Sequence, residues 1–188
     1  MNRKQLIVAV IVILLIVVAL AASVGTFLAT PPTSEITYNA PASAVRASLG
    51  KTASSDTISL RLNGVSDASK PATRDTWVKF NLESSLYNMS LKPPPGEQYL
   101  VANVTAMNVR PTDVYFSYTA FVLLTPNNTA YYANYAVCNK CCSPALENRT
   151  LSACFTSDLY VLFSVPAGTD ADKVVYTASN PPIVMTLT

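Results

Sequence analysis

The sequence predicts an all-β protein, an antiparallel β-sandwich preceded by a single N-terminal transmembrane helix. Residues 6–29 (LIVAVIVILLIVVALAASVGTFLA) carry no charged side chain. Beyond them the chain consists of short apolar or alternating runs, rich in β-branched and aromatic residues and separated by Pro, Gly, Asn and Asp. This pattern is typical of strands and turns. No later run keeps a helical period over three turns, so parallel crossovers are not expected and the strands should pair antiparallel.

Residues 6–29 are long enough to span a membrane. At about 1.5 Å per residue they would form a helix of roughly 36 Å, against a hydrocarbon core of about 30 Å. A secretory signal has a shorter apolar stretch, so an uncleaved anchor is favoured, although the small residues of ALAAS leave cleavage open. Arg3 and Lys4 precede the segment, which places the amino terminus in the cytoplasm. The chain is therefore predicted to be a single-pass cell-membrane protein with its domain on the extracytoplasmic side.

Three regions follow from this organisation. Residues 1–30 are the membrane anchor, residues 31–56 a stalk or loosely held first strand, and residues 57–188 an extracytoplasmic sandwich with a Cys-rich loop at 138–154. In TISLRLN, the residues Ile58, Leu60 and Leu62 share one face of a half-buried strand. Further strands are expected in TWVKFNL, QYLVANVTAMNV, DVYFSYTAFVLL, TAYYANYAV, DLYVLFSV, KVVYT and PIVMTL. Turn residues separate the runs at 63–64, 92–96, 110–113, 125–128 and 166–168.

The composition excludes several function classes. The chain has no histidine, which removes Ser-His-Asp and Cys-His nucleophiles and His-ligated catalytic zinc. Of the 13 basic residues two belong to the anchor, so 11 remain against 11 acidic residues, and nucleic-acid binding has no support. Only 13% of residues are charged, so uncharged polar residues make the surface, which suits an acidic habitat, protein packing or a coat of sugars. We expect no enzyme activity, no catalytic residue, no cofactor and no metal.

One acidic pair deserves a separate hypothesis. Asp170 and Asp172 stand two residues apart in AGTDADK and could contribute to a calcium site. No further oxygen ligands follow at a recognisable spacing. A polar turn between strands is therefore the favoured interpretation.

Three stretches carry a resemblance. The first stretch, GEQYLVANVTAMNV, is similar to a family strand that ends in an Asn before a turn. The second is FVLLTPNNTAYY. The third, LYVLFSVPAGTDADKVVY, is similar to that family's late strand, the Val-Pro that follows it and the closing strand. Together they resemble the immunoglobulin-like domain family of unknown function found on prokaryotic lipoproteins and membrane-anchored surface proteins. The resemblance covers about half the chain. It implies an immunoglobulin-like two-sheet sandwich outside the cell, without established catalytic residues. The chain departs from the pattern in its cysteine-rich insertion.

All four cysteines lie in that insertion: Cys138, Cys141, Cys142 and Cys154. Since the loop is expected outside the cytoplasm, two disulfides are favoured over a metal site. A structural zinc site prefers two separated Cys-x-x-Cys pairs, and the spacing here supplies one. A bridge between adjacent residues is strained, so we expect one of Cys141 and Cys142 to reach Cys154 and the other to close on Cys138.

Four Asn-x-Ser/Thr acceptors suggest N-linked glycans, at Asn88, Asn103, Asn127 and Asn148. Asn127 and Asn148 fall in predicted loops. Asn103 is expected on the polar face of its strand. We predict that each of these four asparagines carries a glycan. The alternative for each is an unmodified surface side chain.

Two function classes survive. The first is a membrane-anchored, glycosylated cell-surface domain that acts in recognition or assembly with a protein partner in an envelope or membrane complex. The loop 138–154 is either its contact or an insertion that the disulfides only keep from unfolding. The second is a subunit of an extracellular filament similar to archaeal type IV pilins, although RKQLIV lacks the small residue usual before that family's apolar run and Pro31-Pro32 ends the helix early. A small accessory subunit of a respiratory complex is a third, weaker hypothesis.

Overall fold

The computed structural model of the protein describes residues 36–68, 93–138 and 149–188. The described residues all belong to one compact unit, Ile36–Thr188. The predicted anchor at residues 6–29 and the predicted strand TWVKFNL lie outside the described residues. Within the described ranges, no helix is long and apolar enough to cross a membrane.

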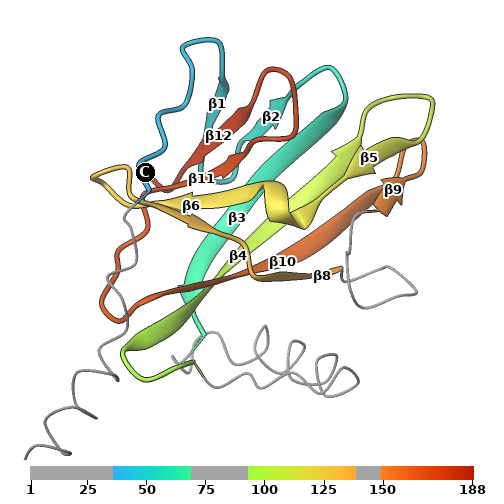
Figure 1. The fold of residues 1–188 in the computed structure, drawn as a ribbon. Coiled ribbons are helices and arrows are strands. Elements are labelled where there is room, and N and C mark those ends of the chain that lie inside the picture. The colour runs from blue at the N-terminus through green and yellow to red at the C-terminus, as the bar shows by residue number, and fades with distance from the viewer. Residues whose placement is uncertain (1–35, 69–92, 139–148) are drawn as a thin grey trace, which may run out of the picture. The chain divides into compact units, whose positions relative to one another are not determined.

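The described chain folds into two stacked five-stranded sheets (Figure 1). The sheet that we call the β6 sheet has the order β1 (Val45–Ser48), β12 (Ile183–Thr186), β11 (Lys173–Tyr176), β6 (Phe121–Leu124) and β7 (Ala130–Tyr132). The β4 sheet has the order β2 (Thr52–Ser54), β3 (Ile58–Asp67), β4 (Glu97–Asn108), β10 (Thr156–Pro166) and β8 (Tyr135–Cys138). A two-stranded ribbon of β5 (Val114–Phe116) and β9 (Arg149–Leu151) and a short 3-10 helix, η2 (Tyr118–Ala120), complete the described elements.

One apolar core fills the space between the two sheets. Alternate residues of both sheets supply it. Leu60, Val104 and Leu159 from the β4 sheet and Leu123 and Val174 from the β6 sheet belong to this cluster, and all five are fully buried. The alternation predicted for Ile58, Leu60 and Leu62 is thereby confirmed, since all three are buried in this core. Each such side chain contributes about 1.5–3 kcal/mol by leaving water. The all-β prediction and the sandwich are confirmed on this arrangement.

Three aromatic rings pack together at one end of the core. Phe116 and Tyr176 stack with centroids 5.2 Å apart, and Phe121 lies 5.8 Å from Phe116 and 4.9 Å from Tyr176. Burial raises the pKa of Tyr176 to about 12, and a hydrogen bond with the backbone of Ser117 offsets part of this rise. The cluster fixes β5, β6 and β11 against one another.

The outer face of the β6 sheet is also apolar. It carries a second cluster of buried side chains that point away from the core: Val122, Leu124, Ala130, Val175 and Val184. Residues 36–44, which we call the strap, pack against this face through Tyr38, Ala40 and Ala44. The strap starts beside β7, where Thr37 bridges Thr129, and ends at β1 on the opposite edge of the sheet.

The strap and two strands lie within residues 31–56. The sequence predicts a stalk or a loosely held first strand there, and the structure describes two strands and a packed segment in residues 36–56. β1 joins the β6 sheet and β2 joins the β4 sheet. Small residues such as Ala44 and Ala53 are buried in this stretch, which composition alone does not reveal.

Other differences concern where strands break. Asn63 and Gly64 do not form a turn: β3 continues through them, with a register shift between Leu62 and Gly64 that marks a β-bulge. DVYFSYTAFVLL is divided by η2 into β5 and β6, and TAYYANYAV is divided at Ala133 and Asn134 into β7 and β8, which belong to different sheets. Antiparallel pairing holds for the paired strands of both sheets except β1 and β12, which run parallel.

Candidate functional site

The β5–β9 ribbon lies at one end of the sandwich, where the predicted Cys-rich loop returns to the core. Val114 pairs with Leu151, Tyr115 with Thr150 and Phe116 with Arg149. Leu151 is buried and belongs to the main core cluster. The segment 138–154 therefore contains a paired strand with a core contact, and a short turn joins this strand to β10.

Asn108 fixes the turns at this end. Its side chain is 1% exposed, and its Nδ2 donates hydrogen bonds to the carbonyl oxygens of Thr112 (2.9 Å), Leu151 (2.9 Å) and Ser152 (3.0 Å). Its Oδ1 accepts a hydrogen bond from the backbone N–H of Arg110 at 2.8 Å. Since an amide carries two donor hydrogens, two of the three carbonyls share one hydrogen. A single buried side chain therefore joins the turn after β4 to the turn between β9 and β10.

Apolar side chains are presented on this fixed frame. Tyr115 is 63% exposed, Val109 41% and Met107 39%. Six large hydrophobic residues are exposed among the described residues, and these are three of them. The other three are Ile36, Leu49 and Tyr132. Arg110 Nη2 and Asp56 Oδ2 form an exposed ion pair at 3.1 Å beside them, which contributes about 0–1 kcal/mol to stability. We call Met107, Val109 and Tyr115 the Tyr115 patch.

The structure describes two of the four cysteines. Cys138 is the last residue of β8, where its backbone pairs with Leu159. Cys154 is exposed, has a backbone φ of 59° and forms no disulfide among the described residues. Cys141 and Cys142, the expected partners, lie outside the described residues. The two disulfides therefore stay a prediction.

Two of the four glycan acceptors are described, and their surroundings differ. Asn127 is exposed in the turn between β6 and β7, where Asn128 N donates to Thr125 O at 2.9 Å. Asn103 is half-buried in the middle of β4, between β3 and β10. Asn88 and Asn148 lie outside the described residues. Of the described pair, Asn127 is the more accessible acceptor.

Asn103 and the third residue of its acceptor motif, Thr105, take part in a polar row across the outer face of the β4 sheet. Thr105 Oγ1 donates to Asp158 Oδ1 at 2.7 Å and accepts from Asn63 Nδ2 at 2.9 Å and Arg61 Nη2 at 3.3 Å. Asn63 Nδ2 also donates to Asn103 Oδ1 at 3.1 Å, and Arg61 Nε donates to Asn63 Oδ1 at 3.0 Å. The bulge between Leu62 and Gly64 brings Asn63 into this row. The row has the character of a cross-strand network that stabilises the sheet.

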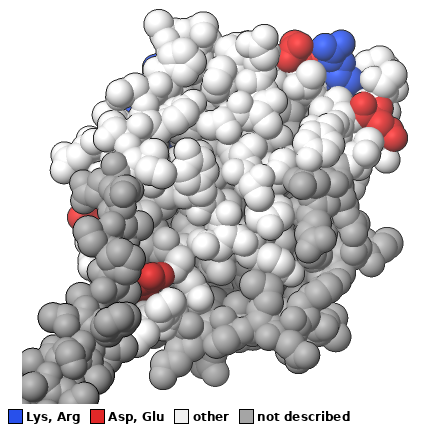
Figure 2. Space-filling model, viewed as in Figure 1, with Lys and Arg blue, Asp and Glu red and all other residues white. Residues whose placement is uncertain are grey.

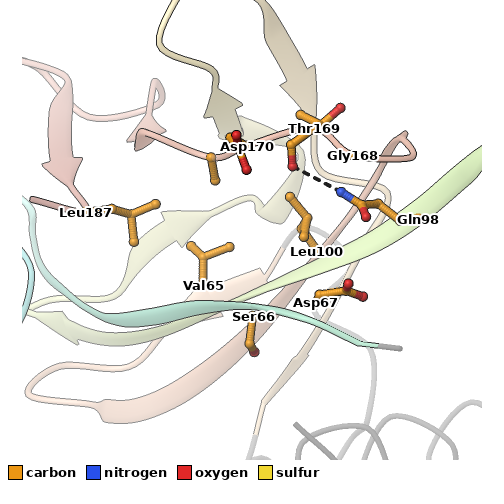
Figure 3. A pocket seen from close by; sticks show the side chains of 10 residues that line it. Val65, Ser66, Asp67, Gln98, Leu100, Gly168, Thr169, Asp170 and Leu187 are labelled. Carbon is orange, nitrogen blue, oxygen red and sulfur yellow. Dashed lines mark hydrogen bonds between the residues drawn. The ribbon is translucent and has the colours of Figure 1, made fainter. Parts of the chain in front are cut away.

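A cavity of about 250 Å³ opens where the ends of β3 and β4 approach the loop after β10 (Figure 3). Gln98 Nε2 donates to Thr169 O at 3.0 Å across it. Among the described residues that line it, Asp67 and Asp170 are titratable. Its volume lies below the roughly 300 Å³ at which pockets for small-molecule ligands begin. The described lining residues do not pair a nucleophile with a lysine base.

The structure separates the two carboxylates of the calcium hypothesis. Asp170 lines the cavity, whereas Asp172 Oδ2 is bound by Lys173 Nζ at 2.5 Å. The backbone of Asp172 is held as well, because its N–H donates to Leu124 O at 2.8 Å. Within the described ranges no group of three Cys, Asp or Glu side chains is placed to hold a metal ion. These observations favour the polar turn.

Comparisons with known proteins give likenesses of fold alone. No protein-family model matches the chain, and no curated protein sequence is significantly similar to it. It is similar to an uncharacterized β-sandwich protein from Clostridium difficile, with 8% identity, a TM-score of 0.47, and coverage of 84% of this chain and 100% of that one. It is similar to the lipoprotein candidate ycdA from Bacillus subtilis, with 15% identity and a TM-score of 0.48 over 72% of this chain and 38% of that one. The yjhA protein of Bacillus subtilis gives 13% identity and a TM-score of 0.44, covering 75% of this chain and 98% of that one.

Proposed function

We propose that the protein is a membrane-anchored, non-catalytic surface domain that binds a protein partner or assembles through the β5–β9 end of its sandwich. The observation that carries the proposal is the Tyr115 patch on its fixed frame. Binding residues are commonly found on loops that a rigid scaffold positions. Tyr and Met are enriched at protein interfaces, and Arg110 supplies the polar rim that usually surrounds such a centre.

The frame also lowers the cost of binding. Association must offset the ordering of loops at the interface, and a loop that is already ordered costs less. Asn108 and the β5–β9 pairing hold the residues around Tyr115 in the absence of a partner. The end with the Tyr115 patch is therefore better suited to recognition than a free surface loop.

We further propose that the sandwich is immunoglobulin-like, and the strand order supports this. In immunoglobulin domains strands A, B, E and D form one sheet, and G, F and C form the other, which some domains extend with C′. The order β3-β4-β10-β8 corresponds to A-B-E-D, and β12-β11-β6-β7 corresponds to G-F-C-C′. The strap, the parallel strand β1 and the edge strand β2 are additions to that plan.

The membrane anchor is the second part of the proposal and rests on residues 6–29. Amino-terminal sequencing of the protein from native membranes tests it. An intact terminus supports an uncleaved anchor, a terminus near Ser23 means secretion, and a terminus at Gln5 or Leu6 means processing of the pilin type. Intact mass before and after reduction and alkylation tests the disulfides, because four free thiols in fresh native material would contradict them.

The recognition surface is tested by cross-linking and affinity recovery from native membranes. We expect Tyr115→Ser to reduce recovery of the cross-linked partner about tenfold, the scale of a residue at the centre of an interface. Leu49→Ser is the matched control, since Leu49 is 42% exposed in the turn between β1 and β2 and should leave recovery unchanged. Equal recovery from Tyr115→Ser and wild type would remove the Tyr115 patch as the contact.

A further inference from the structure

A second exposed apolar group lies at the β7 corner of the sandwich, where the strap begins. Ile36 and Tyr132 are each 50% exposed. Ala130 N donates to Ile36 O at 2.7 Å, and Tyr38 N donates to Asn128 O at 3.1 Å. Burial, and to a lesser extent Tyr132, raise the pKa of Tyr38. We call Ile36, Tyr38 and Tyr132 the β7 corner.

We propose that the β7 corner rests on the headgroup region of the membrane to which the protein is anchored. The proposal depends on the anchor of the proposed function. Its first argument is chain length. Residues 30–35 separate the predicted end of the apolar segment from Ile36, and an extended chain spans at most about 3.6 Å per residue. With residues 6–29 in the membrane, the seven residue steps from Ala29 to Ile36 allow a separation of at most roughly 25 Å between Ile36 and the end of the apolar segment.

The chemistry of the corner is the second argument. Tyrosine is enriched where membrane meets water, because its ring is apolar and its hydroxyl hydrogen-bonds. Residues 36–45 and 114–138, which contain the corner, have no charged residue, and the charges of Asp172 and Lys173 beside Leu124 are paired with each other. Charged side chains are also few on the described surface visible in Figure 2. An uncharged corner avoids the cost of bringing ionised groups to the lipid, and its contact should not require anionic lipid.

The Tyr115 patch provides an internal control. Tyr115 is 63% exposed and Tyr132 50%, so both hydroxyphenyl rings should react similarly with a solvent-borne probe. They stand on different strands, β5 and β7, and only β7 borders the strap. A membrane contact at the β7 corner protects Tyr132 and leaves Tyr115 reactive.

The experiment uses the full chain reconstituted in phosphatidylcholine vesicles. Flotation of the protein with the vesicles is scored first, and hydroxyl-radical oxidation of Tyr132 and Tyr115 is then measured by mass spectrometry. We expect Tyr132 to be oxidised at least about threefold less than Tyr115, with no dependence on salt, since the corner is uncharged. Equal oxidation of the two tyrosines in floating protein would overturn this inference and leave the anchor intact.

Three other outcomes would also overturn it. Protein that fails to float contradicts the anchor and with it the proposed function. Protection of Tyr132 that disappears as the lipid-to-protein ratio is raised identifies a second copy of the chain as the occupant. A glycan found on Asn127 of the native protein would occupy the same corner, because Asn127 precedes the residue that binds the strap.

A substitution gives an independent readout. Trp77 is the single tryptophan of the chain, so Tyr132→Trp and Tyr115→Trp in a Trp77→Phe background each report one position. Lipid brominated near the headgroup should quench Tyr132→Trp about twofold more than Tyr115→Trp. Equal quenching would contradict the contact.

Discussion

The two outer faces of the sandwich are built from different chemistry. On the β6 sheet the outer face is a row of buried aliphatic side chains, including Val122, Val175 and Val184, against which the strap packs. On the β4 sheet the outer face carries the hydrogen-bonded row in which Thr105 and Asp158 lie at the centre. Beside that row is an apolar group of Ala68, Val101, Tyr135, Tyr160 and Leu162.

The comparison shows that one fold can stabilise its two outer faces by different interactions. The β6 sheet gains from removing apolar surface from water, a term that does not depend on direction. The polar row depends on the geometry of each hydrogen bond, and its net contribution per bond is small because water competes for the same groups. Stability should therefore respond strongly to changes beneath the strap and weakly to changes in the polar row.

The largest expected effect comes from placing an acidic residue on the β6-sheet face. Val175→Asp would bury a carboxylate without a partner, since Val175 is 0% exposed among aliphatic side chains. We expect a loss of more than about 4 kcal/mol in the free energy of unfolding, which removes cooperative folding. Urea unfolding followed by circular dichroism measures it. Val175→Ile is the control for the substitution itself, and a cooperative transition in Val175→Asp would contradict the assignment of this face.

Tyr176 lies in the core between the sheets, and its effect on stability can be compared with the effects of changes on the two outer faces. Its pKa of about 12 in the folded protein lies above the value of 10.0 for an unperturbed tyrosine. The neutral phenol is therefore favoured by folding, and stability is fully present below pH 10 and is lost as the pH rises towards 12. The loss amounts to about 2–3 kcal/mol at about 1.36 kcal/mol per pKa unit. Unfolding measured from pH 9 to 12 should decline less steeply for Tyr176→Phe, and parallel curves would refute the attribution.

The strap is expected to contribute an intermediate amount. Tyr38 is half-buried against the β6-sheet face, so Tyr38→Ala removes part of one large side chain. We expect a loss of about 1–2 kcal/mol in the free energy of unfolding. Tyr38→Phe keeps the ring and should differ little from wild type. Identical stabilities for the Ala and Phe variants would show that the strap does not stabilise the sheet through this ring.

The smallest effect is expected in the polar row. Thr105→Val removes the hydroxyl that donates to Asp158 and accepts from Asn63 and Arg61, while the β-branched shape is kept. A loss of about 1 kcal/mol or less is expected because the row is partly exposed to water. Thr105→Ser retains the hydroxyl and should keep the hydrogen bonds. A loss as large as that of Val175→Asp would mean that the two faces do not differ as described.

The sequence predicted strands well where their pattern was local. The alternation in Ile58, Leu60 and Leu62 is visible without any partner strand, and each of these side chains is buried as expected. The turn at residues 125–128 was also predicted correctly, since Asn128 N bonds Thr125 O and Asn128 has a φ of 61°. Asn and Pro specify such turns by their own backbone preferences.

Features that depend on pairing between distant strands could not be predicted. Asn63 and Gly64 were assigned to a turn because that dipeptide favours one, but β4 pairs with β3 on both sides of it and makes it a bulge. The row around Thr105 requires the register of β3, β4 and β10, which the sequence does not state. Asn108 gave a partial signal, as an Asn that ends a strand before a turn, but its burial and three carbonyl partners were visible only in the structure.

The strap has a mechanical consequence for a domain tethered by its amino end. Among the described residues, tension on that end would first load the hydrogen bonds that Ile36 and Tyr38 make at the edge of β7. The bonds of the strap would be loaded one after another, whereas β1 pairs with β12 at four residues that would carry the load together. Of the described elements we therefore expect the strap to yield first and to lengthen the tether while the packing between the sheets is still intact.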